Sequence, residues 1–346
     1  MQHPAPDEVH LRAAIALGLS VRGSTSPNPW VGCRIVGREG EIYEGATSPP
    51  GGAHAEIVAL ARAGSAARGA TAYVTLEPCS HQGRTPPCAD ALVAAGIGRV
   101  VVGTLDPDAR VSGAGVRRLR TAGAQVRVGV LELEVREALA PYLKHRSTGR
   151  PYVVLKLATT LDGRIAAPDG SSAWITGEAA RADTQRLRAE SDAVLVGAGT
   201  VRADDPRLTV RASPRQPLRV VLGEVPEGAL VEPALSLSGE LGGVLDELGQ
   251  RDVLQLLVEG GAQVAHDFHA AGLVDRYVFY VAPALFGGSD AVAAFSGAGA
   301  PTIAQLWRGR LVELRQLGDD VRIELVPTPR PPWLEPRGEH ESPPPS

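Results

Sequence analysis

Three side chains of the kind that bind zinc constrain how the first part of this 346-residue chain can fold: His54, Cys79 and Cys88. His54 ends a loop rich in glycine and proline and precedes an apolar stretch with helical spacing. Cys79 follows a predicted strand and a proline, and Cys88 lies at the start of a predicted helix, whose positive end favours a thiolate. A hydrolytic zinc site takes three protein ligands and leaves one position for water. These residues can serve one ion only if a strand end and two helix starts converge.

Glu56 lies two residues after His54, and residues at this spacing do not share a helix face. Both can approach one metal ion only at the start of the helix, where the preceding loop places them. Zinc lowers the pKa of a bound water towards ~7, and a carboxylate that is not a ligand can carry the proton to a ring nitrogen and then to departing ammonia. The pattern predicts a catalytic zinc site, because a structural site would need four closed ligands and no glutamate. Cys33 lies in an apolar stretch and is interpreted as a plain buried thiol.

The first part of the chain alternates stretches with helical spacing and short apolar runs. Proline just inside a helix start and glycine just past its end mark the expected boundaries. Strands separated by helices predict a mixed α/β fold, in which helices cover the faces of a sheet. The expected helices are 7–19, 54–63, 87–95 and 114–122, and the expected strands are 31–36, 71–76, 99–105 and 126–130.

A domain boundary is expected near residue 148, because glycine and proline interrupt the segment 147–151 and an apolar strand follows. The second part repeats the α/β pattern, although residues 212–250 give no clear signal. Eight of the twenty residues from Pro327 to Ser346 are proline, which predicts disorder. The expected parts are a first domain at 1–147, a second domain at 148–327 and a disordered tail at 328–346. In the second domain the expected strands are 152–158, 192–200, 253–261 and 276–288, and the expected helix is 262–272.

The second domain carries weaker signals of a binding site. No G-x-G-x-x-G fingerprint follows a strand, so a Rossmann-type dinucleotide site is not predicted. Glycine turns at 197–200 and 259–261 follow apolar strands, where backbone amides can approach phosphate, although most such turns are ordinary α/β connections. Lys156 lies within an apolar strand and is one of only two lysines in the chain. Its side chain can either reach solvent at the surface or act as a buried donor near a reacting centre.

Further motifs give the chain a family resemblance over about residues 7–325. The first domain resembles the deaminase half of the bifunctional riboflavin-biosynthesis deaminase–reductases, on Ser26-Pro-Asn-Pro29, His54-Ala-Glu56, Thr75-Leu-Glu-Pro-Cys79 and the run 81–88. The second domain is similar to the reductase half, on Arg150-Pro-Tyr-Val153, Leu155-Lys156, Leu161-Asp-Gly163, Trp174-Ile-Thr176, Leu187-Arg-Ala189, Asp204-Asp-Pro206, Leu208-Thr209 and Val258-Glu-Gly-Gly261. The resemblance implies a three-layer cytidine-deaminase-like domain followed by a dihydrofolate-reductase-like α/β domain.

The resemblance also implies two successive reactions. The first is a zinc-dependent hydrolytic deamination of 2,5-diamino-6-ribosylamino-4(3H)-pyrimidinone 5′-phosphate. The second is an NADPH-dependent reduction of the ribosyl group of 5-amino-6-(5-phosphoribosylamino)uracil to a ribityl chain. The expected cofactors are therefore one Zn²⁺ ion and NADPH, and the expected partner is a small pyrimidine ribotide.

Carried over residue by residue, the resemblance assigns roles in both domains. In the first domain it implies zinc ligands at His54, Cys79 and Cys88, proton transfer by Glu56, and substrate contacts at Asn28, His81, Arg84 and Asp106. In the second it implies cofactor contacts at Ala158, Trp174, Thr200, Asp204 and Gly261, and substrate contacts at Ser172, Arg188, Leu208, Arg211 and Glu259. Arg188 and Arg211 suit bidentate phosphate binding. Lys156 is the candidate donor of the reductase.

The chain departs from the family pattern at two positions of the first domain. Thr47 stands where the family often has a histidine, seven residues before His54. Asp108 stands where the family often has asparagine, in the segment Asp106-Pro-Asp-Ala109. Both departures concern how the substrate is held, and neither touches the predicted ligands or Glu56.

Composition and charge narrow the alternatives. A formal net charge of −4 argues against a basic nucleic-acid surface, and neither a signal peptide nor a membrane span is predicted, so a cytoplasmic protein is expected. A homo-oligomer through the reductase domain is expected from the resemblance alone. Three alternatives stay open: a zinc deaminase of another nucleoside, nucleotide or nucleic acid beside an inactive or differently used reductase-like domain, a zinc-stabilised binding module, and a chain with one active half.

Overall fold

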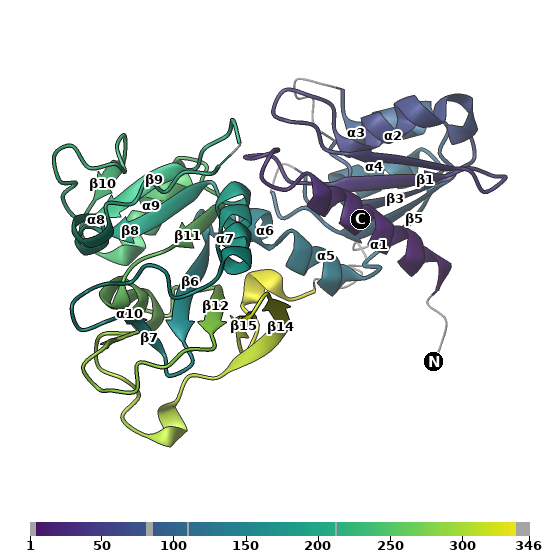
Figure 1. Ribbon diagram of the computed structural model, residues 1–346. Coiled ribbons are helices and arrows are strands. Elements are labelled where there is room, and N and C mark those ends of the chain that lie inside the picture. Colours follow the sequence, from purple (N-terminus) through teal and green to yellow (C-terminus); the bar gives the residue numbers. More distant parts are fainter. Residues whose placement is uncertain (1–4, 81–85, 109–110, 212, 337–346) are drawn as a thin grey trace. The chain divides into compact units, whose positions relative to one another are not determined.

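The computed structural model describes residues 5–80, 86–108, 111–211 and 213–336, and the chain divides into two compact units (Figure 1). The first unit comprises Met1–Thr148 together with Pro332–Ser346, and the second comprises Gly149–Pro331. The predicted mixed α/β fold is confirmed for both units. Within the described part of the chain, no helix has the length and apolar character needed to cross a membrane.

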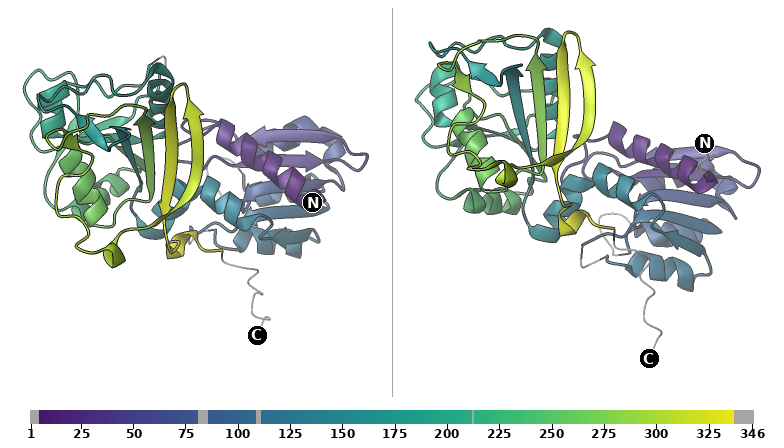
Figure 2. Two further views of the ribbon diagram at one scale, coloured as in Figure 1. Left: turned by 60° about the horizontal axis from the view of Figure 1, so that its bottom comes forward. Right: turned by 90° about the horizontal axis from the view of Figure 1, so that it is seen from below.

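The first unit is built on a five-stranded sheet with the strand order β2-β1-β3-β4-β5. Strand β1 is antiparallel to both of its neighbours, whereas β3, β4 and β5 are parallel. Helices α1 and α5 pack on one face, and α2, α3 and α4 pack on the other (Figure 2). The strands are β1 (Gly32–Val36), β2 (Ile42–Ala46), β3 (Thr71–Leu76), β4 (Arg99–Thr104) and β5 (Gln125–Val128). The helices are α1 (Pro6–Ser20), α2 (Ala55–Ala63), α3 (Cys88–Ala94), α4 (Ala114–Thr121), α5 (Glu132–Ala138) and α6 (Ala140–Thr148), with short 3-10 turns η1 (Gly64–Ala67) and η3 (Pro332–Leu334).

Two glycines let helices approach the sheet of the first unit closely. A Cβ atom on Gly32 of β1 would lie 1.8 Å from the carbonyl oxygen of Ala14 in α1. A Cβ atom on Gly45 of β2 would lie 2.2 Å from the carbonyl oxygen of Ala55, the first residue of α2. Since no side chain fits at either position, the start of α2 is held directly against the sheet.

The second unit is built on an eight-stranded sheet with the order β10-β9-β8-β11-β6-β12-β15-β14. The strands from β10 to β12 are parallel, and β15 and β14 continue the sheet in antiparallel pairs. The strands are β6 (Tyr152–Thr160), β8 (Ala193–Gly197), β9 (Leu218–Leu222), β10 (Leu235–Leu237), β11 (Gln255–Val258), β12 (Arg276–Ala282), β14 (Gly309–Leu317) and β15 (Asp320–Pro327), and a separate pair joins β7 (Arg164–Ala166) to β13 (Val292–Ala293).

Helices cover both faces of this larger sheet. Apolar side chains of α9 (Leu241–Gln250) and α10 (Ala262–Ala270) pack with those of β6, β8 and β11 in the main core cluster. Helix α7 (Glu178–Glu190) lies on the opposite face, where Tyr280 of β12 donates a hydrogen bond to Asp183. Helix α8 (Ala198–Asp204) follows β8 directly, and a 3-10 turn, η2 (Ile303–Gln305), precedes β14.

The expected secondary structure differs from the structure in several places. The segment 192–200 was expected as one strand, but the strand ends at Gly197 and α8 begins at the next residue. The region 212–250 contains β9, β10 and α9, which its weak patterns did not indicate. Helix α9 has two glycines in its first turn, Gly242 and Gly243, and depends on tertiary packing rather than on helix propensity.

The expectation of a disordered tail at 328–346 is wrong for its first part. Leu334 is buried in the 3-10 turn η3. Arg136, which is 1% exposed, donates hydrogen bonds to the carbonyl oxygens of Leu334 (3.2 Å) and Trp333 (2.5 Å). A buried guanidinium needs acceptors, and the tail supplies two of them. Residues 337–346 lie outside the described residues.

A buried carboxylate ties α1 to the sheet of the first unit. Asp7 accepts hydrogen bonds from both terminal nitrogens of Arg99 (2.8 and 2.7 Å), from Arg127 (3.0 Å) and from the hydroxyl of Tyr73 (3.2 Å). The hydrogen bond from Arg99 is the main reason why the pKa of Asp7 is lowered from 3.8 to about 2. One side chain of α1 thereby joins residues of β3, β4 and β5.

This contact predicts a pH-dependent contribution to stability. Because the pKa of Asp7 is lower in the folded state, the contribution is complete above the unfolded pKa of 3.8 and is lost as the pH falls towards about 2. We expect Asp7→Asn to lower the free energy of unfolding at pH 5 by about 1–2 kcal/mol, given that the arginines are partly exposed. Urea unfolding of the whole chain at several pH values measures the difference between variant and wild type. Asp90→Asn, which removes a surface ion pair with Arg118, is the control and should change little. A difference for Asp7→Asn that stays constant between pH 5 and pH 2 would contradict the assignment.

Candidate active sites

The structure brings the three predicted zinc ligands of the first unit together. His54 is the N-cap residue of α2, Cys79 follows the end of β3, and Cys88 is the first residue of α3. Their ligand atoms all lie within 4.8 Å of one another. The Nδ1 atom of His54 is 3.2 Å from Sγ of Cys88 and 3.7 Å from Sγ of Cys79. The strand end and the two helix starts converge as the sequence pattern requires.

These separations fit a tetrahedral zinc site. With Zn–S bonds of ~2.3 Å and Zn–N bonds of ~2.1 Å, tetrahedral angles place a nitrogen and a sulfur ligand about 3.6 Å apart. The two measured nitrogen–sulfur distances, 3.2 and 3.7 Å, lie on either side of this value. One nitrogen and two sulfur ligands leave a fourth position for water or substrate, as in catalytic sites.

The thiols of the two cysteines in this cluster interact, and their pKa values shift in opposite directions. The backbone amide of Cys88 donates a hydrogen bond to Sγ of Cys79 (3.3 Å). The hydrogen bond from the Cys88 side chain lowers the pKa of the Cys79 thiol, and the nearby His54 imidazole lowers it further. Cys33, in contrast, is fully buried in β1 and is not part of the cluster, and burial raises the pKa of its thiol. Among the cysteines that the structure describes, only Cys79 therefore has surroundings that lower the pKa of its thiol.

Glu56 lies in the first turn of α2, two residues after His54, and it is 4% exposed. Burial raises the pKa of its carboxyl to about 7, and the nearby Cys79 acts in the same direction. A buried carboxyl that can hold or release a proton near neutral pH is suited to proton transfer.

The remaining predicted contacts of the first unit have different surroundings. Asn28 lies in the turn after α1, where its carbonyl oxygen accepts a hydrogen bond from Thr25. Asp106 is buried after β4, and burial raises the pKa of its carboxyl to about 6. Thr47 uses its hydroxyl within the fold, because it accepts a hydrogen bond from the backbone amide of Val31 (3.0 Å). His81 and Arg84 lie outside the described residues.

Tyr142 was missed by the sequence analysis. Its hydroxyl group, on α6, donates to the carboxylate of Asp106, with distances of 3.0 and 3.2 Å to the two oxygens. The backbone amide of Asp108 donates to the same carboxylate (2.9 Å). Although Asp108 departs from the family pattern, its backbone therefore supports Asp106. Nothing in the local pattern of α6 points to this role, since the two residues are 36 positions apart.

In the second unit a buried ion cluster joins three of the predicted residues. Glu259 follows β11 and accepts two hydrogen bonds from Arg188 of α7, at 2.5 and 3.0 Å. The ammonium group of Lys156 on β6 lies 3.7 Å from the same carboxylate. Although burial acts to raise it, the charges of Arg188 and Lys156 lower the pKa of Glu259 overall. Lys156 is therefore a partly buried, ion-paired lysine rather than one that reaches freely into solvent.

This cluster changes the expectation for Arg188. The expectation was bidentate binding of phosphate, but its planar group already holds Glu259 in that manner. Its remaining terminal nitrogen donates to the carbonyl oxygen of Thr209 (3.3 Å). The structure thus directs the guanidinium towards the protein, where it compensates the buried carboxylate.

Other predicted residues lie near the carboxyl ends of the parallel strands. Thr200 in α8, just after β8, accepts a hydrogen bond from the amide of Gly261, the N-cap residue of α10 (3.2 Å). Ser172 donates a hydrogen bond to Asp204 at the end of α8 (3.3 Å). Ligands of open α/β sheets bind beyond the carboxyl ends of the strands, which is where these side chains lie.

The last four predicted residues differ in accessibility. Trp174 is 74% exposed, and the guanidinium carbon of Arg181 lies 4.8 Å from its ring centre. Arg211 is exposed, whereas Ala158 on β6 is partly buried. Leu208 is 2% exposed, so it belongs to the packed interior.

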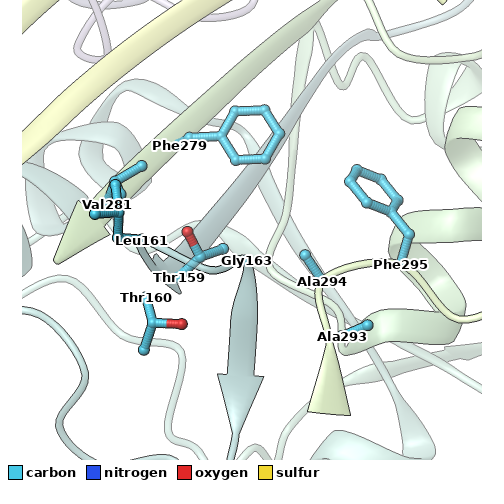
Figure 3. A pocket seen from close by; sticks show the side chains of 9 residues that line it. All are labelled: Thr159, Thr160, Leu161, Gly163, Phe279, Val281, Ala293, Ala294 and Phe295. Atoms are coloured by element: carbon cyan, nitrogen blue, oxygen red, sulfur yellow. The ribbon is translucent and has the colours of Figure 1, made fainter. Parts of the chain in front are cut away.

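A pocket with a volume of about 420 Å³ lies beside β6 and β12, on the face of the sheet opposite to α7 (Figure 3). Thr159 and its neighbour Val281 point into it, whereas Lys156 and Ala158 alternate to the face covered by α7. The lining is apolar apart from two threonine hydroxyls, and it includes no residue from the predicted sets. The described lining residues are Thr159, Thr160, Leu161, Gly163, Phe279, Val281, Ala293, Ala294 and Phe295.

Two family models match the chain. The cytidine and deoxycytidylate deaminase zinc-binding region matches residues 5–104, and the RibD C-terminal domain matches residues 151–323. Each match falls within one of the two structural units.

Curated relatives and solved structures are similar over nearly the whole chain. The riboflavin biosynthesis protein RibD of Mycobacterium tuberculosis (strain H37Rv) is 45% identical, with 90% of this chain and 95% of the relative covered. RibD of Escherichia coli K12 is 40% identical, with 92% and 99% covered. Among solved structures, Acinetobacter baumannii RibD has a TM-score of 0.86 at 41% identity, with 93% and 99% covered. A Thermotoga maritima protein described as a diaminohydroxyphosphoribosylaminopyrimidine deaminase/5-amino-6-(5-phosphoribosylamino)uracil reductase has a TM-score of 0.83 at 34% identity, with 93% and 98% covered.

The ligand geometry predicts how metal content depends on the cysteines. We expect Cys79→Ser to lower the zinc content of the purified chain from about one ion to near zero. The two ligands that remain, His54 and Cys88, do not suffice to hold the ion tightly. Cys33→Ala is the matched control and should retain the zinc, since Cys33 is outside the cluster. Elemental analysis after gel filtration measures both variants. Full zinc content in Cys79→Ser, or its loss in Cys33→Ala, would show that the cluster is not the metal site.

Proposed function

The chain belongs to the RibD family, the bifunctional deaminases and reductases of riboflavin biosynthesis, and from this premise we propose which residues and cofactors carry its two reactions. The first unit hydrolyses 2,5-diamino-6-ribosylamino-4(3H)-pyrimidinone 5′-phosphate and releases ammonia. The second unit reduces the ribosyl group of the product, 5-amino-6-(5-phosphoribosylamino)uracil, to a ribityl chain. The observation that carries the proposal is the cluster of His54, Cys79 and Cys88 beside the buried Glu56.

For the deamination, we assign the zinc ligands to His54, Cys79 and Cys88. When bound by these residues, a zinc ion would supply hydroxide at neutral pH, because it would lower the pKa of a water molecule. Glu56 takes a proton from the water and gives it to the ring nitrogen, and it then carries a second proton, from the hydroxyl group of the adduct, to the departing amino group. Its burial supports this role, because a carboxyl with a pKa of about 7 can both accept and donate a proton.

The substrate of the deaminase is held by polar groups around this centre. We assign Asn28, Asp106, His81 and Arg84 to this task. Asp106 is supported for it by Tyr142, which fixes one orientation of the carboxylate through a hydrogen bond. Thr47 uses its hydroxyl within the fold, so we assign it no substrate contact.

For the reduction, we assign NADPH to the carboxyl ends of the parallel strands of the second unit. Hydride transfer requires mainly that C4 of the nicotinamide be aligned with the acceptor carbon. The proposed cofactor contacts are Ala158, Trp174, Thr200, Asp204 and Gly261, and the proposed substrate contacts are Ser172, Arg211, Glu259 and the backbone at Leu208. Arg188 holds Glu259 in place, and Lys156 is the proposed proton donor beside it.

We also propose the extent of each domain. The deaminase comprises residues 1–147 and the reductase residues 148–327, and the segment after β15 completes the first unit through its contacts with Arg136. We propose that the chain forms a homo-oligomer through the reductase domain, as the family resemblance implies.

The role of Glu56 predicts a separation of the two activities. We expect Glu56→Gln to lower ammonia release by at least ~10²-fold, because an amide of similar size cannot carry the proton. NADPH oxidation on pre-deaminated substrate should be unchanged. Ammonia and NADPH absorbance are followed separately, and Glu44→Gln on β2 serves as a control outside the cluster. Loss of both activities with the fold intact would contradict separate sites.

The role of Lys156 predicts a turnover defect without a binding defect. We expect Lys156→Met to lower reductase turnover by ~10²-fold, because methionine keeps the apolar stem but removes the donor. NADPH affinity, measured by fluorescence titration, should change little. Near-normal turnover at unchanged NADPH affinity would exclude Lys156 as the donor.

A further inference from the structure

Glu77 is a buried carboxylate of the first unit to which no role has been assigned so far. It follows the last residue of β3 and precedes Cys79 by two positions, within the motif Thr75-Leu-Glu-Pro-Cys79. Its side chain is 4% exposed, and its own amide donates to the carbonyl oxygen of Thr104 at the end of β4 (3.0 Å). A carboxylate so deeply buried requires several donors to offset the loss of water.

Within the described residues, four backbone amides donate hydrogen bonds to the Glu77 carboxylate. One oxygen, Oε2, accepts from Asp106 (3.3 Å) and from Gly113 (2.9 Å). The other, Oε1, accepts from Gly115 (2.9 Å) and from Val116 (3.2 Å). The carboxylate therefore accepts from an amide after the end of β4, from the amide of the residue before α4, and from two amides in the first turn of α4.

This arrangement caps α4 from a distant part of the chain. Helix α4 begins at Ala114, and the amides in its first turn have no partner within the helix. Its N-cap residue is Gly113, which has no side chain to serve them, and no side-chain cap bond is formed locally. Glu77 supplies the negative group that the positive end of the helix favours.

The turn after β3 and the start of α4 also pack closely against each other. A Cβ atom on Gly115 would lie 1.9 Å from the carbonyl oxygen of Pro78 and 3.3 Å from Oε1 of Glu77. The start of α4 therefore lies directly against the turn that presents Cys79, and no side chain fits between them.

The segment that Glu77 holds also carries Asp106. The amide of Asp106 is bound to Glu77, and its carboxylate is bound by Tyr142 and by the amide of Asp108. The backbone and the side chain of Asp106 are thus held by different partners. We propose that Glu77 is a positioning residue of the deaminase, which sets the distance between the Cys79 ligand and the Asp106 carboxylate by binding both segments at once. This inference rests on the proposed function, in which Asp106 contacts the substrate.

The chemistry requires a carboxylate rather than an amide at this position. Glutamate has two acceptor oxygens for four amides, whereas glutamine has one oxygen and an NH₂ group. In Glu77→Gln the NH₂ group would face two amide donors that lose their acceptor. Since an unsatisfied buried donor is costly, one of the two segments should shift away from the turn.

The experiment compares Glu77→Gln with wild type in the full-length chain. We expect the KM of the deaminase for the ribotide to rise about tenfold or more, with kcat changed less. Zinc content and reductase turnover should stay at wild-type values. Amide hydrogen exchange at 106, 113 and 116 should become faster, while exchange in β1 stays the same. Glu134→Gln, an exposed glutamate on α5 that pairs with Arg12, is the control and should change none of these.

Two further variants keep the inference open to refutation if Glu77→Gln folds poorly. Glu77→Asp keeps the charge but is shorter by one methylene, and it should show the same pattern with a smaller rise in KM. Tyr142→Phe releases only the side chain of Asp106, so it should raise KM without changing exchange at 116. If Glu77 and Tyr142 both act through Asp106, the double variant should raise KM by less than the product of the single effects.

Several outcomes would overturn the inference. An unchanged KM together with faster exchange at 113 and 116 would show that Glu77 only stabilises the helix start. Loss of zinc at an unchanged KM would show that it only supports the ligand. If wild type released no ammonia from the ribotide, the proposed function would fail, but the exchange at 106 and 116 would still decide whether Glu77 joins the two segments.

Discussion

Both units depend on one constraint, which is that the carboxyl ends of neighbouring parallel strands meet at one edge of a sheet. In the first unit β3 ends before the turn with Cys79, and parallel β4 ends before Asp106. In the second unit Thr200 lies in the first turn of α8, directly after β8, and Glu259 and Gly261 follow parallel β11. The hydrogen bonds between strands end at this edge, so backbone amides and side chains there become available to ligands. Residues far apart in the sequence thereby meet.

The cost of burying charge at these edges is met in two different ways. Among the described residues, Glu77 accepts hydrogen bonds from backbone amides, which carry no net charge. Glu259 is instead paired with Arg188 and Lys156, which makes a local charge cluster. A buried pair of this kind adds little to stability, because the loss of hydration offsets the attraction between the charges. Its value here is geometric, since it holds a lysine and a carboxylate in fixed relation.

Much of the fold followed from local patterns, and the exceptions share a physical cause. Stretches such as 7–19, 54–63 and 71–76 formed the expected elements, because their apolar spacing and their glycine or proline boundaries act locally. Helix α9 was not predicted, because its glycines oppose helix formation and its packing against β8 and β11 decides the outcome. The ordered part of the proline-rich tail was missed for a similar reason. Its order depends on Arg136, a residue almost 200 positions earlier.

The sequence by itself determined the residues on which the proposed chemistry rests: the types of the candidate zinc ligands, their order along the chain, and a carboxylate two residues after the histidine. These are properties of short segments, and short segments are what a sequence displays. Only the tertiary structure decided which groups support them. These supporting contacts join residues that are distant along the chain: Tyr142 with Asp106, Glu77 with the first turn of α4, and Arg188 with Glu259. A hydrogen bond between such residues leaves no periodic signal, because its strength depends on burial and distance rather than on spacing.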